Sequence, residues 1–378
     1  MSGIKRVHYP NLNSVRFIAA SMVLIHHCEQ IKSIFKYPNI FDNHTFVPLA
    51  GKLGVDLFFV LSGFLISSLL IIEKEYSGTI KVKNFIIRRL YRIWPVYFLI
   101  VIVGFFLLPH VSIFQVGRPF INIYPNFWAS LTMYILFLPH VQIMIIGPII
   151  GAAQAWSIGI EEEFYLVWPF LVKKFDTKKL LKIIFIFVAI YLAVTLFLRY
   201  EASIVINRKD NNAPGIQVLY QLFANSFKFD CLLIGCYFAY LNKKITDYHF
   251  LLSKWFQLSV YLTEIILAYN GSDFRGFYWE IHAVLYGFIL MNLIRAKTSL
   301  INLEIKPLNY LGKISYGMYM YHIIVIVAVF RLLQNMQLMV LFYPVVFASV
   351  IMVSVLSYEV FERRFLKKKL SFTTIFTN

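Results

Sequence analysis

Two ionisable side chains lie eleven residues apart in the apolar stretch 13–28, NSVRFIAASMVLIHHC, with Arg16 near its start and His27 near its end. On an α-helix, eleven residues rise about 16 Å and complete about three turns, so both side chains project from one face. A charge in hydrocarbon costs several kcal/mol unless it faces protein or water, so this pair indicates a functional site. A histidine in such a site could accept a proton from an alcohol near neutral pH.

Four further polar side chains interrupt apolar stretches elsewhere in the chain: Asp56, Glu161, Asp230 and His322. Each one alone fits a polar contact between neighbouring helices at least as well as it fits a site. Together with a buried histidine they predict a polar cavity. We expect Glu161 to orient the imidazole and Asp56 to form a further polar wall of that cavity.

A cluster of three arginines, Arg88, Arg89 and Arg92, precedes Pro95 in the run VKNFIIRRLYRIWP. Arg89 and Arg92 are three residues apart, so their guanidinium groups can project to one side of a helix. Two such groups suit phosphates, which arginine binds through paired hydrogen bonds. A cluster that reaches toward lipid headgroups explains the spacing equally well.

The composition places the chain among polytopic membrane proteins. Its 378 residues are 59% hydrophobic and 18% aromatic, with a mean hydropathy of +0.69. The net charge of +17 comes from basic residues that flank apolar runs, which argues against nucleic-acid binding. Three cysteines without ligand spacing predict neither a disulfide framework nor a metal site, and we expect no cleavable signal peptide.

The elements that must position these residues are apolar runs long enough to span a bilayer. One additional apolar stretch, 127–146, is interrupted by Pro139 and is predicted to be a re-entrant segment on the outer side. We predict an all-α polytopic membrane helix bundle, forming a single domain over 1–378 without an appended soluble domain. Its ten transmembrane helices are expected at 14–34, 54–72, 93–109, 156–172, 180–198, 218–241, 251–269, 277–294, 314–332 and 338–360.

Basic residues set the expected orientation. With ten crossings and both termini in the cytoplasm, 26 basic residues fall on the inner side and nine on the outer side, as the positive-inside rule requires. An eleventh crossing would reverse this bias in the second half of the chain. The arginine cluster then lies at the inner side, whereas His27, Asp56 and Glu161 lie toward the outer side. We therefore expect a protein of the cytoplasmic (inner) membrane, in contact with lipid.

Five motifs occur in an order and spacing that resemble the acyltransferase family 3 membrane proteins, integral enzymes that acylate sugars and often O-acetylate surface polysaccharides. The resemblance covers nearly the whole chain. The ten residues between Arg16 and His27 match the family and select His27 over His26. The other matching positions are Asp56, Ser62 and Gly63 in GVDLFFVLSGFLI, Arg89 and Arg92 in RRLYRIWP, Trp156, Ser157, Glu161, Phe164, Tyr165 and Pro169 in WSIGIEEEFYLVWP, His322 in SYGMYMYH, and Glu362 in SYEVFERRF.

The resemblance implies roles for these residues. His27 would be the catalytic residue with Arg16 as its helix-mate, and Arg89 and Arg92 would bind the acyl donor. Ser62, Trp156, Tyr165, Asp230 and His322 would support the site, together with Asp56. The chain departs from the family at Lys228, where arginine is usual, and at Arg363, which replaces a proline.

The expected function is transfer of an acyl group, which we expect to be acetyl, from cytoplasmic acyl-CoA to a hydroxyl of an extracytoplasmic saccharide. Acetyl-CoA would be a co-substrate, with no cofactor or metal held permanently, and a separate extracytoplasmic transferase could be a further partner. Transfer through a covalent acyl-histidine or acyl-cysteine stays open. A secondary transporter or glycan exporter is the alternative class, although no internal repeat typical of it is visible, and a catalytically idle partner is a third.

Overall fold

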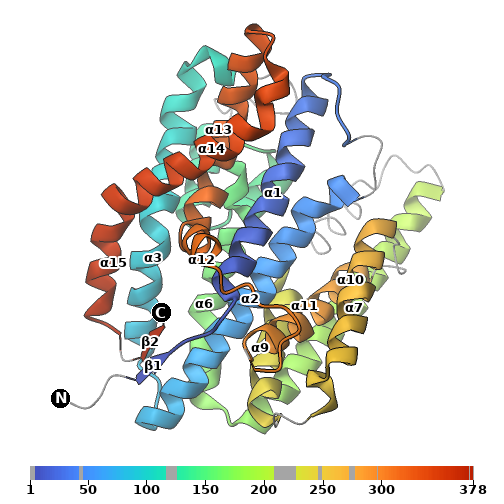
Figure 1. Ribbon diagram of the computed structural model, residues 1–378, viewed down its shortest axis with the longest axis vertical. Coiled ribbons are helices and arrows are strands. Elements are labelled where there is room, and N and C mark those ends of the chain that lie inside the picture. The colour runs from blue at the N-terminus through green and yellow to red at the C-terminus, as the bar shows by residue number, and fades with distance from the viewer. Residues whose placement is uncertain are drawn as a thin grey trace. The chain divides into compact units, whose positions relative to one another are not determined.

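The computed structural model describes residues 5–41, 46–115, 126–207, 227–245, 249–271, 277–295, 297–373 and 375–377 (Figure 1). Nearly all of them are helical, which confirms the predicted all-α class. The strands found in this part of the chain are β1 (Lys5–Val7) and β2 (Ile375–Thr377), which pair in parallel with Lys5 opposite Ile375.

The chain divides into two compact units. The first comprises Met1–Val55, Lys81–Gly159 and Asn302–Asn378, and the second comprises Asp56–Ile80 and Ile160–Ile301. Each unit is therefore assembled from segments that are far apart in the sequence. The expected single domain stays a prediction.

The first unit is built around α1 (Leu12–Ile34), α3 (Val82–Ile102) and α13 (Ser315–Asn335). In it, α13 packs against α1 and α14, and α15 runs beside α3 (Figure 1). The first ten residues of α2 and the first four of α6 also belong to it. Its other helices are α4 (Phe127–Ile135), α5 (Pro139–Ile145), α12 (Lys306–Lys313), α14 (Phe342–Leu356) and α15 (Arg363–Leu370), with π-helical turns at Val103–Leu107 and Ser357–Glu362 and 3-10 turns at Leu108–His110, Ser112–Phe114, Ala153–Ala155 and Met339–Leu341.

The second unit holds the remaining parts of α2 (Phe46–Ser77) and α6 (Trp156–Lys174). Within this unit, α11 packs against α9 and α10, and α7 packs against α9. The bounds of these helices are α7 (Thr177–Asn207), α9 (Phe229–Lys244), α10 (Lys254–Asn270) and α11 (Tyr278–Leu293), with a 3-10 turn at Phe250–Leu252.

Each of the ten predicted spans coincides with a helix, although the first part of the sixth span, 218–226, lies outside the described residues. By length and composition, five described helices could cross a membrane: Phe46–Ser77, Val82–His110, Thr177–Ala202, Ser315–Gln334 and Met339–Leu370. Helices α9, α10 and α11 fall short because they have 16, 17 and 16 residues. Charged side chains interrupt α1 and α6. Ten crossings therefore stay a prediction.

The stretch 127–146 does not form an eleventh spanning helix. It folds as α4 and α5, of nine and seven residues, which at about 1.5 Å per residue are each far shorter than a bilayer core of about 30 Å. The helices are separated at Phe137, whose φ of 59° lies in the left-handed region, and at Pro139, which begins α5. The re-entrant character of this segment stays a prediction.

Two glycines let α2 and α9 touch through their backbones. A Cβ on Gly63 would lie 1.9 Å from the carbonyl oxygen of Leu232, and one on Gly235 would lie 2.1 Å from the carbonyl oxygen of Val60. Small residues allow such close approach of membrane helices. The contact explains why a glycine is needed in the SGF sequence of α2.

We expect Gly63→Ala to destabilise the protein by about 1–3 kcal/mol, because the added methyl group forces the two backbones apart. The measurement is the thermal unfolding midpoint of the purified protein in detergent. Gly317→Ala in α13 is the matched control, since its Cβ would lie no closer than 3.3 Å to another atom. Equal midpoints for the two variants would contradict the backbone contact.

Candidate functional site

Two histidines that the sequence singled out meet in the first unit. Nε2 of His322, on α13, lies 3.2 Å from Nδ1 of His27, on α1, and the ring centroids are 4.8 Å apart. His322 is buried and His27 half-buried. The structure thus pairs the expected base with a residue that had only a supporting role in the sequence analysis.

Hydrogen-bond partners determine which ring nitrogen carries each proton. Nδ1 of His322 lies 2.5 Å from the carbonyl oxygen of Tyr319, which can only accept, so Nδ1 is the donor and Nε2 of the neutral ring is an acceptor. The proton between the rings must then sit on Nδ1 of His27, which also lies 2.9 Å from the carbonyl oxygen of Val23. Nε2 of His27 is left with its lone pair, as a general base requires.

A buried network holds α13 in this position. The Tyr319 hydroxyl donates to the carbonyl oxygen of Gln154 at 2.9 Å and lies 2.7 Å from the Ser157 hydroxyl. Nε2 of Gln154 donates in turn to the carbonyl oxygen of Met320 at 2.6 Å. Ser157 follows the half-buried Trp156 at the start of α6. The WSI sequence therefore supports the turn of α13 that carries His322.

His26 has a structural role. Its Nδ1 lies 3.0 Å from the carbonyl oxygen of Val47, and its ring packs on Gly51, where a Cβ would lie 2.5 Å away. The His26 ring stands edge-on to the His27 ring, with centroids 4.8 Å apart. This packing agrees with the choice of His27 as the candidate base.

Cationic side chains gather where α1, α3 and α15 meet. Lys369 of α15 lies within electrostatic reach of four arginines, Arg16, Arg88, Arg89 and Arg92. These five side chains are half-buried, and we call them the basic cluster. Arg16 thus lies with the expected donor-binding arginines, about three helical turns before His27 on α1.

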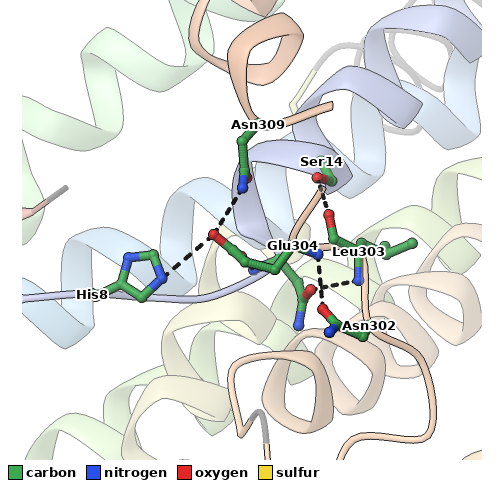
Figure 2. A network of polar contacts seen from close by, with 7 residues as sticks. His8, Ser14, Asn302, Leu303, Glu304 and Asn309 are labelled. Carbon is green, nitrogen blue, oxygen red and sulfur yellow. Dashed lines mark hydrogen bonds and ion pairs between the residues drawn. The ribbon is translucent and has the colours of Figure 1, made fainter. Parts of the chain in front are cut away.

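A polar network anchors the start of α1 beside this cluster. The backbone N–H of Asn11 donates to the Glu304 carboxylate at 2.5 Å, and the Asn11 side chain accepts from the backbone N–H of Leu303 at 2.6 Å. A carboxylate at a helix N-terminus is favoured by the helix dipole. Figure 2 shows the surrounding contacts of His8, Ser14, Asn302, Leu303, Glu304 and Asn309.

In the second unit, three of the expected residues form a hydrogen-bonded chain. The Tyr165 hydroxyl donates to the Glu161 carboxylate at 2.8 Å and lies 2.5 Å from the Ser62 hydroxyl. This chain joins α6 to α2. Because Glu161 belongs to the second unit and His27 to the first, the orienting role of Glu161 stays a prediction.

The second unit also buries a group of charges, which we call the charge cluster: Asp56, Lys228, Asp230 and Glu280. Their exposed fractions are 2%, 4%, 0% and 8%. The Lys228 ammonium lies within electrostatic reach of all three carboxylates and 5.0 Å from the centroid of the Trp279 ring. Asp56 and Asp230 were singled out from the sequence, but Glu280 was missed, although a carboxylate inside an apolar run was a usable signal.

A buried histidine and a glutamate also make contact in the second unit. Nδ1 of His282 is 2.8 Å from the Glu264 carboxylate, joining α11 to α10. Sequence reasoning missed this pair as well. In the part of the chain that the structure describes, no group of three or more His, Cys, Asp or Glu side chains could hold a metal ion.

Comparison with known proteins identifies the family to which the sequence is similar. The sequence model of an acyltransferase domain matches residues 9–359. A Staphylococcus aureus strain COL protein, provisionally named an O-acetyltransferase, is 28% identical over 384 residues, covering 96% of this chain and 58% of that protein. The O-acetyltransferase OatA of S. aureus strain NCTC 8325 is 29% identical over 345 residues, covering 84% of this chain and 53% of OatA. The chain thus spans little more than half of these curated relatives, and no solved structure matches it.

Proposed function

Because the chain belongs to the acyltransferase domain family, we propose that it is a membrane-embedded O-acyltransferase that moves an acyl group from cytoplasmic acyl-CoA to a hydroxyl of an extracytoplasmic saccharide. The names of two relatives favour acetyl as the group and acetyl-CoA as the co-substrate. The bias of basic residues favours the cytoplasmic membrane with both termini inside. The observation that carries the proposal is the His27–His322 pair, which leaves a lone pair on Nε2 of His27.

In the proposed reaction, Nε2 of His27 takes the proton of the acceptor hydroxyl while that oxygen attacks the thioester carbonyl. The carbon–sulfur bond breaks, CoA leaves as a thiolate, and the thiolate takes the proton from Nε2 of the His27 imidazolium, which restores the neutral base. Throughout this step, Nδ1–H of His27 donates to Nε2 of His322, so the imidazolium that forms keeps a hydrogen-bond acceptor. His322 is a positioning residue in this scheme.

The acyl-CoA donor would be bound at the cytoplasmic side of the membrane. Arg89 and Arg92 lie on α3 in the basic cluster, and their planar groups suit the phosphates of CoA. The pantetheine arm would carry the thioester from this cluster toward His27. A separate extracytoplasmic transferase as a further partner also belongs to the proposal.

A transport function and covalent catalysis are the competing proposals. A transporter or glycan exporter would not consume a thioester, whereas an acyltransferase must. A covalent route needs an accessible nucleophile, and Cys28, beside His27, is fully buried. This burial argues against an acyl-cysteine, whereas an acyl-histidine at Nε2 of His27 stays a competing proposal.

We expect the protein in lipid nanodiscs, supplied with acetyl-CoA and membranes from its own cells, to release CoA thiol and to add acetyl groups to a glycan. Thiol release is measured with a thiol reagent, and acetylation by mass spectrometry of surface glycans from cells with and without the protein. Intact acetyl-CoA together with unchanged glycans would contradict the proposed function. Radiolabelled acetyl-CoA without acceptor tests the covalent route, since only that route leaves label on the chain.

A further inference from the structure

Lys369 differs from the other basic residues of α15 in the direction it faces. Lys367 and Lys368 are exposed, and so are Arg363 and Arg364, whereas Lys369 is half-buried. It lies among the arginines of α1 and α3, because α15 packs along α3 (Figure 1). A lysine that serves only to reach lipid headgroups would extend outward, as its neighbours do.

Several positive charges converge around Lys369. Four arginines lie within electrostatic reach of its ammonium, and the Glu362 carboxylate lies within reach of Arg92. Among the residues that the structure describes, the ammonium has no hydrogen bond or ion pair. Like charges held together disfavour each other, so an arrangement of this kind favours an anion that neutralises several of them at once.

The proposed donor has a matching charge. The CoA moiety carries a diphosphate and a 3′-phosphate, together about four negative charges at neutral pH. The five cationic side chains of the basic cluster have the charge sign that such a polyanion requires. The planar guanidinium group of arginine can donate two hydrogen bonds to one phosphate, and the lysine ammonium adds a compact positive charge.

We propose that Lys369 binds the phosphates of the acyl-CoA donor together with Arg89 and Arg92, so that α15 forms a second wall of the donor site. This inference rests on the proposed function, because it takes acyl-CoA as the donor. It assigns a binding role to a segment beyond the family motifs. Anionic lipid headgroups carry the same phosphate chemistry, so the experiment must separate the two sources.

The experiment compares wild type with Lys369→Ala in nanodiscs of neutral phosphatidylcholine, which removes anionic headgroups. We expect Lys369→Ala to raise KM for acetyl-CoA by about tenfold with a much smaller change in kcat, as for the loss of one charge-assisted contact. Lys369→Arg should restore most of the affinity. Lys368→Ala, which removes an exposed neighbouring charge, is the matched control and should behave as wild type.

Donor analogues then locate the contact. S-acetylpantetheine lacks all the CoA phosphates, so the tenfold difference between wild type and Lys369→Ala should disappear with it. Acetyl-dephospho-CoA lacks only the 3′-phosphate and shows which phosphate the ammonium contacts. Equal KM values for acetyl-CoA in wild type and Lys369→Ala would overturn the inference, as would a penalty that persists with S-acetylpantetheine.

Calorimetric binding of unacylated CoA separates this inference from the proposed function, because it needs no turnover. Tight binding by wild type and about tenfold weaker binding by Lys369→Ala support the inference even where no acyl transfer occurs. Binding that is equal in the two proteins, or absent in wild type, overturns it. A difference that appears only in nanodiscs of anionic phosphatidylglycerol would assign Lys369 to lipid and also overturn it.

Discussion

Replacing His27 by alanine lowers the rate of acyl transfer by about 10²- to 10⁴-fold, the usual contribution of a general base. The structure gives the reason, since the pairing with His322 leaves Nε2 of His27 as the proton acceptor. The measurement is the initial rate of CoA thiol release from acetyl-CoA with acceptor membranes, at equal amounts of folded protein. His110→Ala, which removes an exposed histidine in the same unit, is the control and should keep full activity.

His322 supplies a second part of this test. In His322→Phe, Nδ1–H of His27 loses its acceptor on the neighbouring ring, so we expect a smaller fall in kcat than in His27→Ala. The two substitutions should not add, because the His322 contact acts only through His27. Full transfer by His27→Ala would refute the proposed mechanism, and additive losses would refute the positioning role of His322.

Replacing Lys228 by alanine is expected to destabilise the protein by about 3–5 kcal/mol, the cost of removing one partner from a buried ionic group. Lys228 is the cation of the charge cluster, and its removal takes away the ammonium that lies within electrostatic reach of buried Asp56, Asp230 and Glu280. The free energy of unfolding in mixed detergent, with a thermal midpoint as a second readout, measures this loss.

Three comparisons make the Lys228 test specific. Lys228→Arg keeps the charge and should stay close to wild type. Glu280→Gln in the Lys228→Ala background should recover part of the loss, because it removes one carboxylate from a cluster that has lost its ammonium. Lys243→Ala, which breaks the exposed ion pair with Glu75 in the same unit, should cost no more than about 1 kcal/mol. Equal stability of Lys228→Ala and Lys243→Ala would contradict the charge cluster.

The positions of the helices could be predicted from the sequence because apolar runs and their basic flanks are local signals. Each expected span therefore has a helix, and the broken stretch at Pro139 divides into two short ones. The choice of His27 over His26 came from a motif, and the packing of His26 against Gly51 provides a physical reason for it.

The contacts between helices could not be predicted in the same way. His27 and His322 are 295 residues apart, and nothing in either local sequence indicates that the rings meet. Lys369 belongs to a run of basic residues in which every member looks alike, and only the packing of α15 on α3 distinguishes it. Glu280 is different, because a carboxylate within an apolar run can be seen in the sequence. Lys228, the cation near it, can also be singled out there, because it stands where the family usually has arginine.

The separation of His27 and His322 along the chain also bears on how the protein is made. Ribosomes add about 5–20 residues per second, so the 295 residues between the two histidines take about 15–60 s to synthesise. The segments of the second unit are all translated before α13, whereas the first unit needs segments from both ends of the chain. During that interval the His27 ring lacks its partner, and the nascent chain has no complete base. In the proposed mechanism, acyl transfer therefore requires that α13 has been synthesised, so a nascent chain that has not reached α13 would not act on the donor.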